Sequence, residues 1–215
     1  MFRIRIQNKK KCIWYCSAVV SFLLFLLLLG WTNHLANTQD AQQMAGRWSE
    51  KKDVAQISCF FSSKAEVTED TIQSFEYSLK NVLQEASITE TSENPSARLW
   101  VDAYSADGKI TLVNGKNTLD ANAIGIGGDF FMFHPLKLIT GAYFSGNDLM
   151  QDYCIIDQDA AWQLFGSNDV VGMTVYISNV PHIVTGVVQR PDSRMDKAAG
   201  LNSTVVYVSY GTLSA

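Results

Sequence analysis

The chain has 215 residues, of which 47% are apolar and 18% are charged, and this composition excludes a wholly disordered chain because it supplies ample material for a core. The net charge of −4 hides an asymmetry, since five basic residues precede residue 12 and no acidic residue precedes Asp40. Beyond residue 31 the chain carries 12 basic and 21 acidic residues. This excess of acidic residues argues against a nucleic-acid-binding surface beyond residue 31, because such a surface needs clustered Lys and Arg.

Residues 12–31 (CIWYCSAVVSFLLFLLLLGW) form an uninterrupted apolar stretch without a charge. As a helix, this stretch would span about 30 Å, the thickness of the hydrocarbon core of a bilayer. Trp14, Tyr15 and Trp31 lie near its ends, where amphipathic rings favour the headgroup region. The stretch therefore predicts a transmembrane helix.

The basic segment 1–11 predicts a cytoplasmic N-terminus, which places everything after the helix outside the cytoplasm of a single-pass cell-membrane protein. The alternative is a cleaved signal peptide, although the apolar core is long for one and the best cleavage site is poor. Residues 32–53 are polar, and we expect them to form a stalk that continues the helix.

The four cysteines divide between the two sides of the predicted boundary. Cys12 and Cys16 belong to the anchor, whereas Cys59 and Cys154 lie outside the cytoplasm, where a disulfide between them could persist. The sequence does not show that these two approach within bonding range. No cysteine or histidine cluster has zinc-ligand spacing, so the sequence predicts no metal site.

The first half of the body has strand and helix signals. Residues 54–62 (VAQISCFFS) are typical of a partly buried strand. Thr68 is a plausible N-cap of a helix with one apolar face, which we expect to pack on a sheet. This face comprises Ile72, Phe75, Leu79, Val82, Leu83 and Ala86. Residues 98–104 and 109–113 predict two strands that flank a hairpin turn at 107–108 (Asp-Gly), and Asn114-Gly115 marks another turn.

The second half is richer in strands. Asp157 can cap a short helix over 158–165, with Gly166 as its C-terminal stop. Residues 173–177 and 182–188 predict a hairpin across Asn179, and residues 203–210 predict a last strand. The order of elements indicates an α+β fold: one transmembrane helix, then a mixed α/β domain with a strand-rich second lobe.

The sequence predicts no catalytic or cofactor-binding residue. The phosphate-binding P-loop pattern is absent, and the glycines at 125–128 lack the spacing of a dinucleotide loop, so turns or bulges explain them better. His34, His134 and His182 have no accompanying hydrolase or zinc-protease motif. Asp157 and Asp159 are better explained as helix cap and dipole partners than as paired catalytic carboxylates. An anchored hydrolase is therefore only a distant alternative to the two hypotheses given below.

Three runs carry a family resemblance. They are GGDFFMFHPLKLITGAYFSGNDL (127–149), CIIDQDAAWQLFGSNDVVGMTVYISNVPHIVTGVV (154–188) and STVVYVSYGTL (203–213). With the helix before them, they resemble the MacB-like periplasmic core domain of FtsX-like ABC transporter permeases. The most specific portion is AWQLFG…VVG…VTGVV. Ala142, Met173 and Ser209 depart from the Arg, Lys and Pro usual at these places.

The resemblance implies a non-catalytic domain, residues 54–215, that couples transporter motion to substrate or partner proteins. It implies as partners the membrane, a cytoplasmic ABC ATPase subunit, further permease helices and an extracytoplasmic protein. Family members continue into more α/β structure and three further membrane helices, so we expect this domain to be incomplete. A single anchor helix cannot enclose a pore, so we expect no transport by the chain alone. The alternative is a membrane-anchored sensor or ligand-binding module that shares the fold.

Overall fold

The computed structural model describes residues 9–37, 43–48, 54–88, 98–146, 148–190 and 203–214. The chain divides into two compact units, Met1–Gln56 and Ile57–Ala215. The second unit begins within the predicted strand 54–62, and each unit is described by itself.

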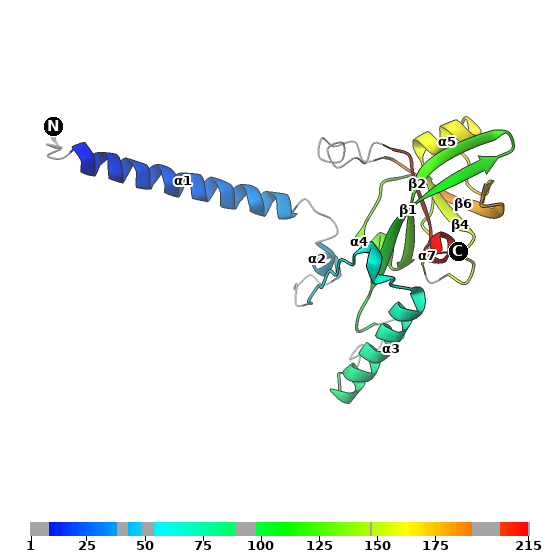
Figure 1. Cartoon of the computed structure of the whole chain (residues 1–215), viewed down its shortest axis with the longest axis horizontal. Helices are drawn as coiled ribbons and strands as arrows, with labels where there is room; N and C mark the ends of the chain where they lie inside the picture. Colours follow the sequence, from blue (N-terminus) through cyan, green and yellow to red (C-terminus); the bar gives the residue numbers. More distant parts are fainter. Residues whose placement is uncertain are drawn as a thin grey trace. The chain divides into compact units, whose positions relative to one another are not determined.

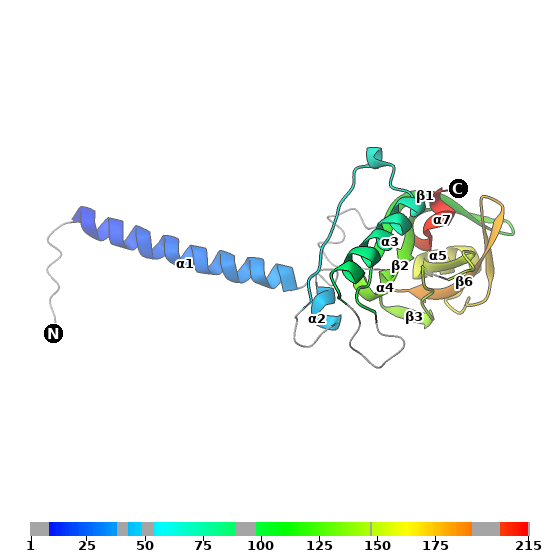
Figure 2. The same ribbon diagram turned by 90° about the horizontal axis from the view of Figure 1, so that it is seen from below.

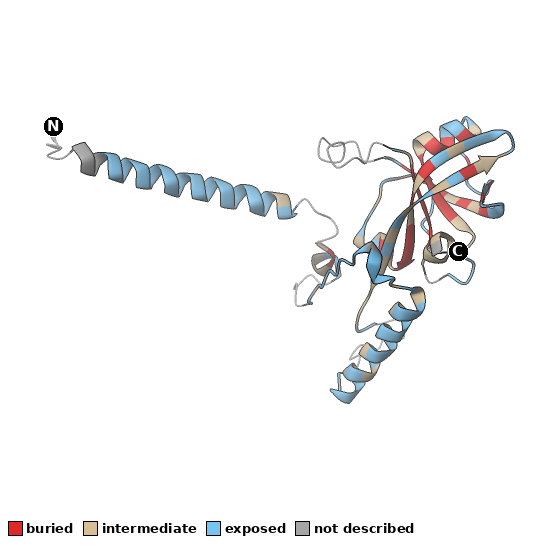
Figure 3. Ribbon diagram, viewed as in Figure 1, coloured by how far each residue is buried: buried red, intermediate tan, exposed pale blue. Residues whose placement is uncertain are grey.

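The first unit is dominated by one long helix, α1 (Lys9–Asn37), followed by the short α2 (Met44–Trp48). Within α1, Ile13–Asn37 is long and apolar enough to cross a membrane, and none of it is buried within the protein (Figure 3). The predicted span 12–31 lies inside this helix, which runs on into the first part of the predicted stalk. The remaining stalk residues 38–42 and 49–53, like residues 1–8, lie outside the described part.

The second unit contains a seven-stranded sheet and several short helices (Figures 1 and 2). Its helices are η2 (Ser63–Ala65), α3 (Glu69–Glu85), α4 (Phe130–Phe133), α5 (Gln158–Phe165) and α7 (Tyr210–Ser214). Its strands are β1 (Ala103–Asn114), β2 (Asn117–Gly128), β3 (Leu138–Gly141), β4 (Tyr153–Asp157), β5 (Thr174–Ile177), β6 (Val180–Val188) and β7 (Val205–Ser209). The predicted mixed α/β fold with a strand-rich second lobe is confirmed.

The sheet closes on itself through β6. The strand order is β3-β6-β4-β7-β2-β1-β5, and β5 also pairs with β6, which joins the two sides of the ladder into a ring. β6 pairs with β5 through Val180–Ile183 and with β3 through its last residues, while β4 lies along its other side. The β2–β7 and β4–β6 pairs are parallel, and the other pairs are antiparallel.

Alternating residues of β4 and β7 supply two separate cores. Cys154, Ile156, Val206 and Val208 belong to a core that α5 covers, with Ala160, Ala161 and Leu164 buried on that helix. Ile155, Val205 and Tyr207 point to the opposite core, which is rich in aromatic rings. Because successive strand residues face opposite sides, these strands are buried on both faces, which explains their continuous apolar sequences.

The second-half predictions are confirmed. Asp157 caps α5 by accepting a hydrogen bond from Ala160 N at 2.8 Å, and Gly166 ends the helix in the left-handed conformation with φ of 74°. The β5–β6 hairpin turns through Ser178 and Asn179, whose φ of 67° fits the expected left-handed conformation. The last strand is present as β7 and is shorter than the predicted 203–210.

The predicted hairpin turn at 107–108 is wrong. Asp107 and Gly108 lie in the middle of the long strand β1, and the actual turn is the one predicted at Asn114-Gly115, where β1 meets β2. The glycines at 125–128 likewise belong to the body of β2 rather than to a turn or a bulge. In both strands the missing side chains make room for neighbours described below.

The predicted strand over 54–62 is also wrong, because residues 55–62 have no regular secondary structure and pair with no strand of the sheet. Thr68 caps α3 as predicted, accepting a hydrogen bond from Thr71 N at 3.3 Å. The expected packing of α3 on a sheet is only partial: Ile72 and Leu79 are half-buried, whereas the Phe75 side chain is 66% exposed. No residue of α3 is fully buried.

Candidate functional site

The short helix α7 lies against the ring beside the start of α3 (Figures 1 and 2). Its Leu213 side chain rests on glycines of two neighbouring strands. A Cβ at Gly125 of β2 would lie 2.7 Å from Leu213 Cδ1, and a Cβ at Gly108 of β1 would lie 3.0 Å from Leu213 Cδ2. Real Cβ atoms do not approach side chains so closely, so these two glycines form the floor of a socket, which we call the Leu213 socket.

A polar network holds a second side of α7. Thr212 Oγ1 lies 3.2 Å from His182 Nε2 and 3.4 Å from the backbone oxygen of Gln151. His182 is buried, and its Nδ1 lies 3.1 Å from the carbonyl of Val180. A carbonyl only accepts hydrogen bonds, so Nδ1 donates to Val180, and the hydroxyl of Thr212 donates to the carbonyl of Gln151. This hydroxyl–imidazole pair has no carboxylate partner at Nδ1, and it serves as a structural contact.

Tyr210 connects α7 to the segment before α3. Its hydroxyl donates a hydrogen bond of 2.8 Å to the carbonyl of Val67, and its ring meets the Tyr104 ring edge-on with centroids 5.2 Å apart. The Tyr104 ring in turn lies across Gly127, where a Cβ would overlap it. Burial, reinforced by nearby Glu69, raises the pKa of Tyr104 to about 12, so its hydroxyl stays protonated.

A pair of carboxyl groups lies between α3 and the start of β1. Partial burial raises the pKa of Glu76, and the charge of Asp102 and a hydrogen bond to it raise this pKa further. Two carboxylates oppose each other unless one holds a proton. Nearby, Arg98 binds Asp129 with 2.6 Å between nitrogen and oxygen. No periodic pattern in the sequence predicts these contacts, because residues 76 and 102 belong to separate segments of the chain.

Asp157 is the centre of a second charged cluster, at the ends of β4 and β6 and the start of β7. Its carboxylate is buried and accepts hydrogen bonds from Arg190 Nη2 at 2.6 Å and from Val205 N at 3.0 Å, besides capping α5. Arg190 also binds Asp159 at 2.8 Å. The predicted cap and dipole roles of the two aspartates therefore hold, and the sequence reasoning missed Arg190 as their common partner.

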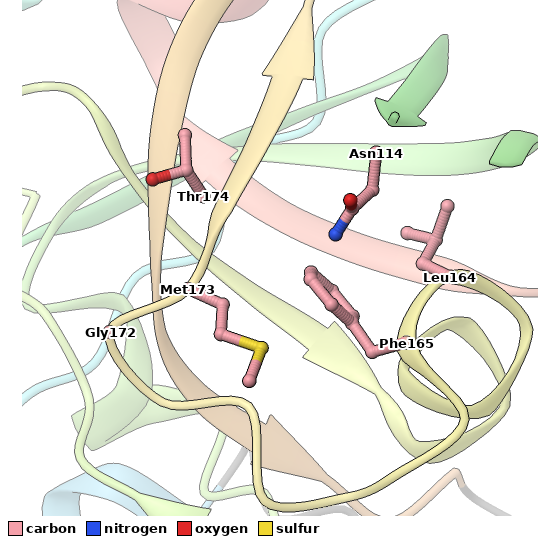
Figure 4. A pocket seen from close by; sticks show the side chains of 6 residues that line it. All are labelled: Asn114, Leu164, Phe165, Gly172, Met173 and Thr174. Atoms are coloured by element: carbon pink, nitrogen blue, oxygen red, sulfur yellow. The ribbon is translucent and has the colours of Figure 1, made fainter. Parts of the chain in front are cut away.

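An open cleft of about 610 Å³ lies between the β1–β2 turn and the segment that leads into β5 (Figure 4). Its lining comprises Asn114, Leu164, Phe165, Gly172, Met173 and Thr174. The Asn114, Phe165 and Met173 side chains point toward one another in Figure 4. The lining side chains include one amide and one hydroxyl and no titratable group, so the cleft offers no side chain for acid–base chemistry.

The histidines and cysteines singled out from the sequence are dispersed. His34 lies in the last turn of α1, the His134 ring stacks on Phe130, and His182 is buried under α7. The structure does not bring Cys59 and Cys154 together: both are free thiols, Cys59 exposed and Cys154 completely buried. Burial raises the pKa of Cys154 to about 12. Among the described residues, no group of three His, Cys, Asp or Glu side chains could hold a metal ion.

Comparison with known proteins assigns the chain to a family. The sequence model of the MacB-like periplasmic core domain matches residues 20–215. A macrolide export ATP-binding/permease protein, MacB, of Chromobacterium violaceum is 31% identical over 99 residues, which are 45% of this chain and 15% of the relative. The corresponding protein of Pasteurella multocida is 29% identical over 98 residues and is covered to 14%. The chain thus spans a small part of these curated relatives.

Two solved structures are similar to the chain. The periplasmic region of MacB from Actinobacillus actinomycetemcomitans matches with a TM-score of 0.42 and 26% identity, over 54% of this chain and 52% of that one. The extracellular domain of the ABC-type transporter YknZ from Gram-positive bacteria matches with a TM-score of 0.42 and 23% identity, over 52% and 55% of the two chains. On the match of the family model over residues 20–215, the chain belongs to the MacB-like periplasmic core domain family of ABC transporter permeases.

Proposed function

We propose that the chain is the membrane anchor and extracytoplasmic domain of an ABC transporter permease, and that it couples movements of the transporter to a substrate or partner protein without catalysing a reaction. The observation that carries this proposal is the family match, which runs from the apolar helix through the whole folded body. The relatives are named as ATP-binding/permease proteins, and the part of the chain that the structure describes contains one candidate spanning helix, which by itself encloses no pore.

The arrangement of the body supports coupling. Its strands form a ring with two packed cores, which behaves as a rigid block. The candidate spanning helix Ile13–Asn37 precedes this block in the chain, so a movement of membrane helices reaches the block through the backbone.

The proposed orientation can be tested with Cys59, which is exposed. In a background with Cys12→Ser and Cys16→Ser, a membrane-impermeant maleimide applied to spheroplasts should label Cys59, and the matched variant Cys59→Ser should lose the signal. Labelling that appears only after permeabilisation would place the body in the cytoplasm and contradict the proposal.

The proposed partnership needs a separate experiment. The full chain is isolated in mild detergent from cells that naturally make it, beside a version in which residues 12–31 are replaced by a cleavable signal sequence. We expect an ABC ATPase subunit with the anchored chain and not with the released body. Recovery of no ATPase with either version would refute an assembly in the membrane.

A further inference from the structure

α7 contacts five places in the chain. Leu213 rests on β1 and β2, Thr212 binds His182 of β6 and the backbone at Gln151, and Tyr210 binds Val67 just before α3. The Tyr210–Val67 bond joins residues 143 positions apart. Five residues thus connect the closed ring to the segment that leads into α3.

We propose that α7 is a latch that holds the N-terminal end of α3 on the ring and that opens when Leu213 leaves its socket. The inference deepens the proposed coupling function, but its test needs neither a membrane nor a partner, so the two can fail separately.

The contacts of α3 explain why it needs a latch. No residue of this helix is fully buried, and Phe75 on its predicted apolar face is 66% exposed, so burial holds it weakly. Glu76 faces Asp102, an arrangement that opposes docking when both groups are ionised. The hydrogen bond from Tyr210 to Val67 therefore carries a large share of the attachment, and the edge-on contact with Tyr104 of β1 holds the Tyr210 ring on the closed ring of strands.

The Leu213 socket explains how the latch is held closed. Gly125 and Gly108 lie on paired strands, since Ala106 faces Gly125 and Gly108 faces Ala123. A glycine in a strand interior is unfavourable on its own, and two of them under one leucine indicate that the fold reserves this space for Leu213. When the segment before α3 moves, it pulls on Tyr210, which lies three residues from Leu213. The pull is passed on to Leu213 and draws it out of its socket.

The first test removes one hydroxyl from the latch. Hydrogen exchange followed by mass spectrometry is measured on the full chain in detergent micelles, for the wild type and Tyr210→Phe. Loss of one hydrogen bond should raise exchange in peptides covering residues 67–78 about fivefold, while peptides of β4 and β6 keep the wild-type rate. The matched control is Tyr176→Phe, which removes an exposed hydroxyl on β5 and should change nothing.

The second test empties the Leu213 socket and then refills it. Leu213→Ala should raise exchange in α7 and in residues 67–78 together, and adding Gly125→Ala to it should be tolerated or lower that exchange. In the wild-type background Gly125→Ala displaces Leu213 and should raise exchange in α7 and in residues 67–78. The same substitution should therefore raise exchange when Leu213 is present and not when it is Ala. If Leu213→Ala unfolds the ring, faster exchange in peptides of β4 and β6 shows it. In that case the Tyr210→Phe measurement alone decides whether α7 acts as a latch. Wild-type exchange of α3 in Tyr210→Phe would overturn the latch, whatever the other variants do.

Discussion

At the scale of single residues, Asp157 shows how one carboxylate can organise several elements. The sequence pattern correctly predicted it as a helix cap, because an Asp before an amphipathic stretch is a local signal. Its bonds to Arg190 and to Val205 N were beyond prediction, since they depend on the pairing of β4 with β6 and β7. Local signals thus identified the residue and one of its roles, and tertiary structure added the others.

Replacing Asp157 should therefore cost more than the loss of a cap. The Asp157 side chain is 2% exposed, so Asp157→Asn leaves the partly buried Arg190 without its inner carboxylate, and we expect a loss of about 3 kcal/mol in the free energy of unfolding. Asp159→Asn is the matched control: it removes the outer partner of the same arginine, is 46% exposed, and should cost less than about 1 kcal/mol. Denaturant titration of the full chain in micelles, followed by tryptophan fluorescence, measures both. Equal losses for the two variants would show that burial does not govern this cluster.

At the scale of elements, failures of prediction came from contacts distant in sequence. The Asp107-Gly108 pair has the composition of a turn, but Gly108 lacks a side chain because Leu213, from the far end of the domain, packs over it. Residues 54–62 have a strand pattern but no neighbouring strand in the structure, and a strand needs one to form. The boundaries of α3 could be predicted from its N-cap and periodicity. The extent to which its side chains are buried could not be predicted from them.

Attachment of α3 should depend on pH through Glu76. The folded state raises the pKa of this carboxyl, so folding favours its protonated form, and docking should be stronger at low pH and weaken as the pH rises through the folded pKa. Glu76→Gln removes the charge, and we expect about twofold to threefold slower exchange of α3 amides at pH 7 after correction for intrinsic rates.

The difference between Glu76→Gln and the wild type should vanish below pH 4.5, the ordinary pKa of glutamate, where both side chains are neutral. Glu85→Gln, at the exposed C-terminal end of α3, serves as the control and should leave exchange near residue 76 unchanged at either pH. An effect of Glu76→Gln that persists below pH 4.5 would mean that shape rather than charge controls the docking.

At the scale of the whole molecule, the apolar span and the strand-rich domain were predictable, whereas the closure of the sheet was not. Composition alone distinguished residues 12–31 from the acidic remainder, because a charge-free apolar run of this length has few explanations. Ring closure depends on β6 pairing with both β4 and β5, and this follows from register and twist, which single-sequence patterns do not encode.

The closed ring can be probed through its buried thiol. Cys154 lies on β4 and is completely buried with a pKa of about 12, so a thiol reagent should reach it only when the ring opens. In the Cys12→Ser, Cys16→Ser background, we expect Cys59 to react at least about a thousandfold faster than Cys154, in line with the stability of ordinary domains. Denaturant should remove the difference. Rates within tenfold of each other in native conditions would show that the ring opens locally at β4.

The three-way pairing of β6 also determines how the body withstands force. Hairpins and edge strands peel apart one hydrogen bond at a time, whereas a strand clamped by ladders on both sides must slide past all of them at once. A pull along β6 would therefore meet simultaneous resistance from β3, β4 and β5. The part of the protein that detaches first under tension should lie outside the ring, where α3 is held by few contacts.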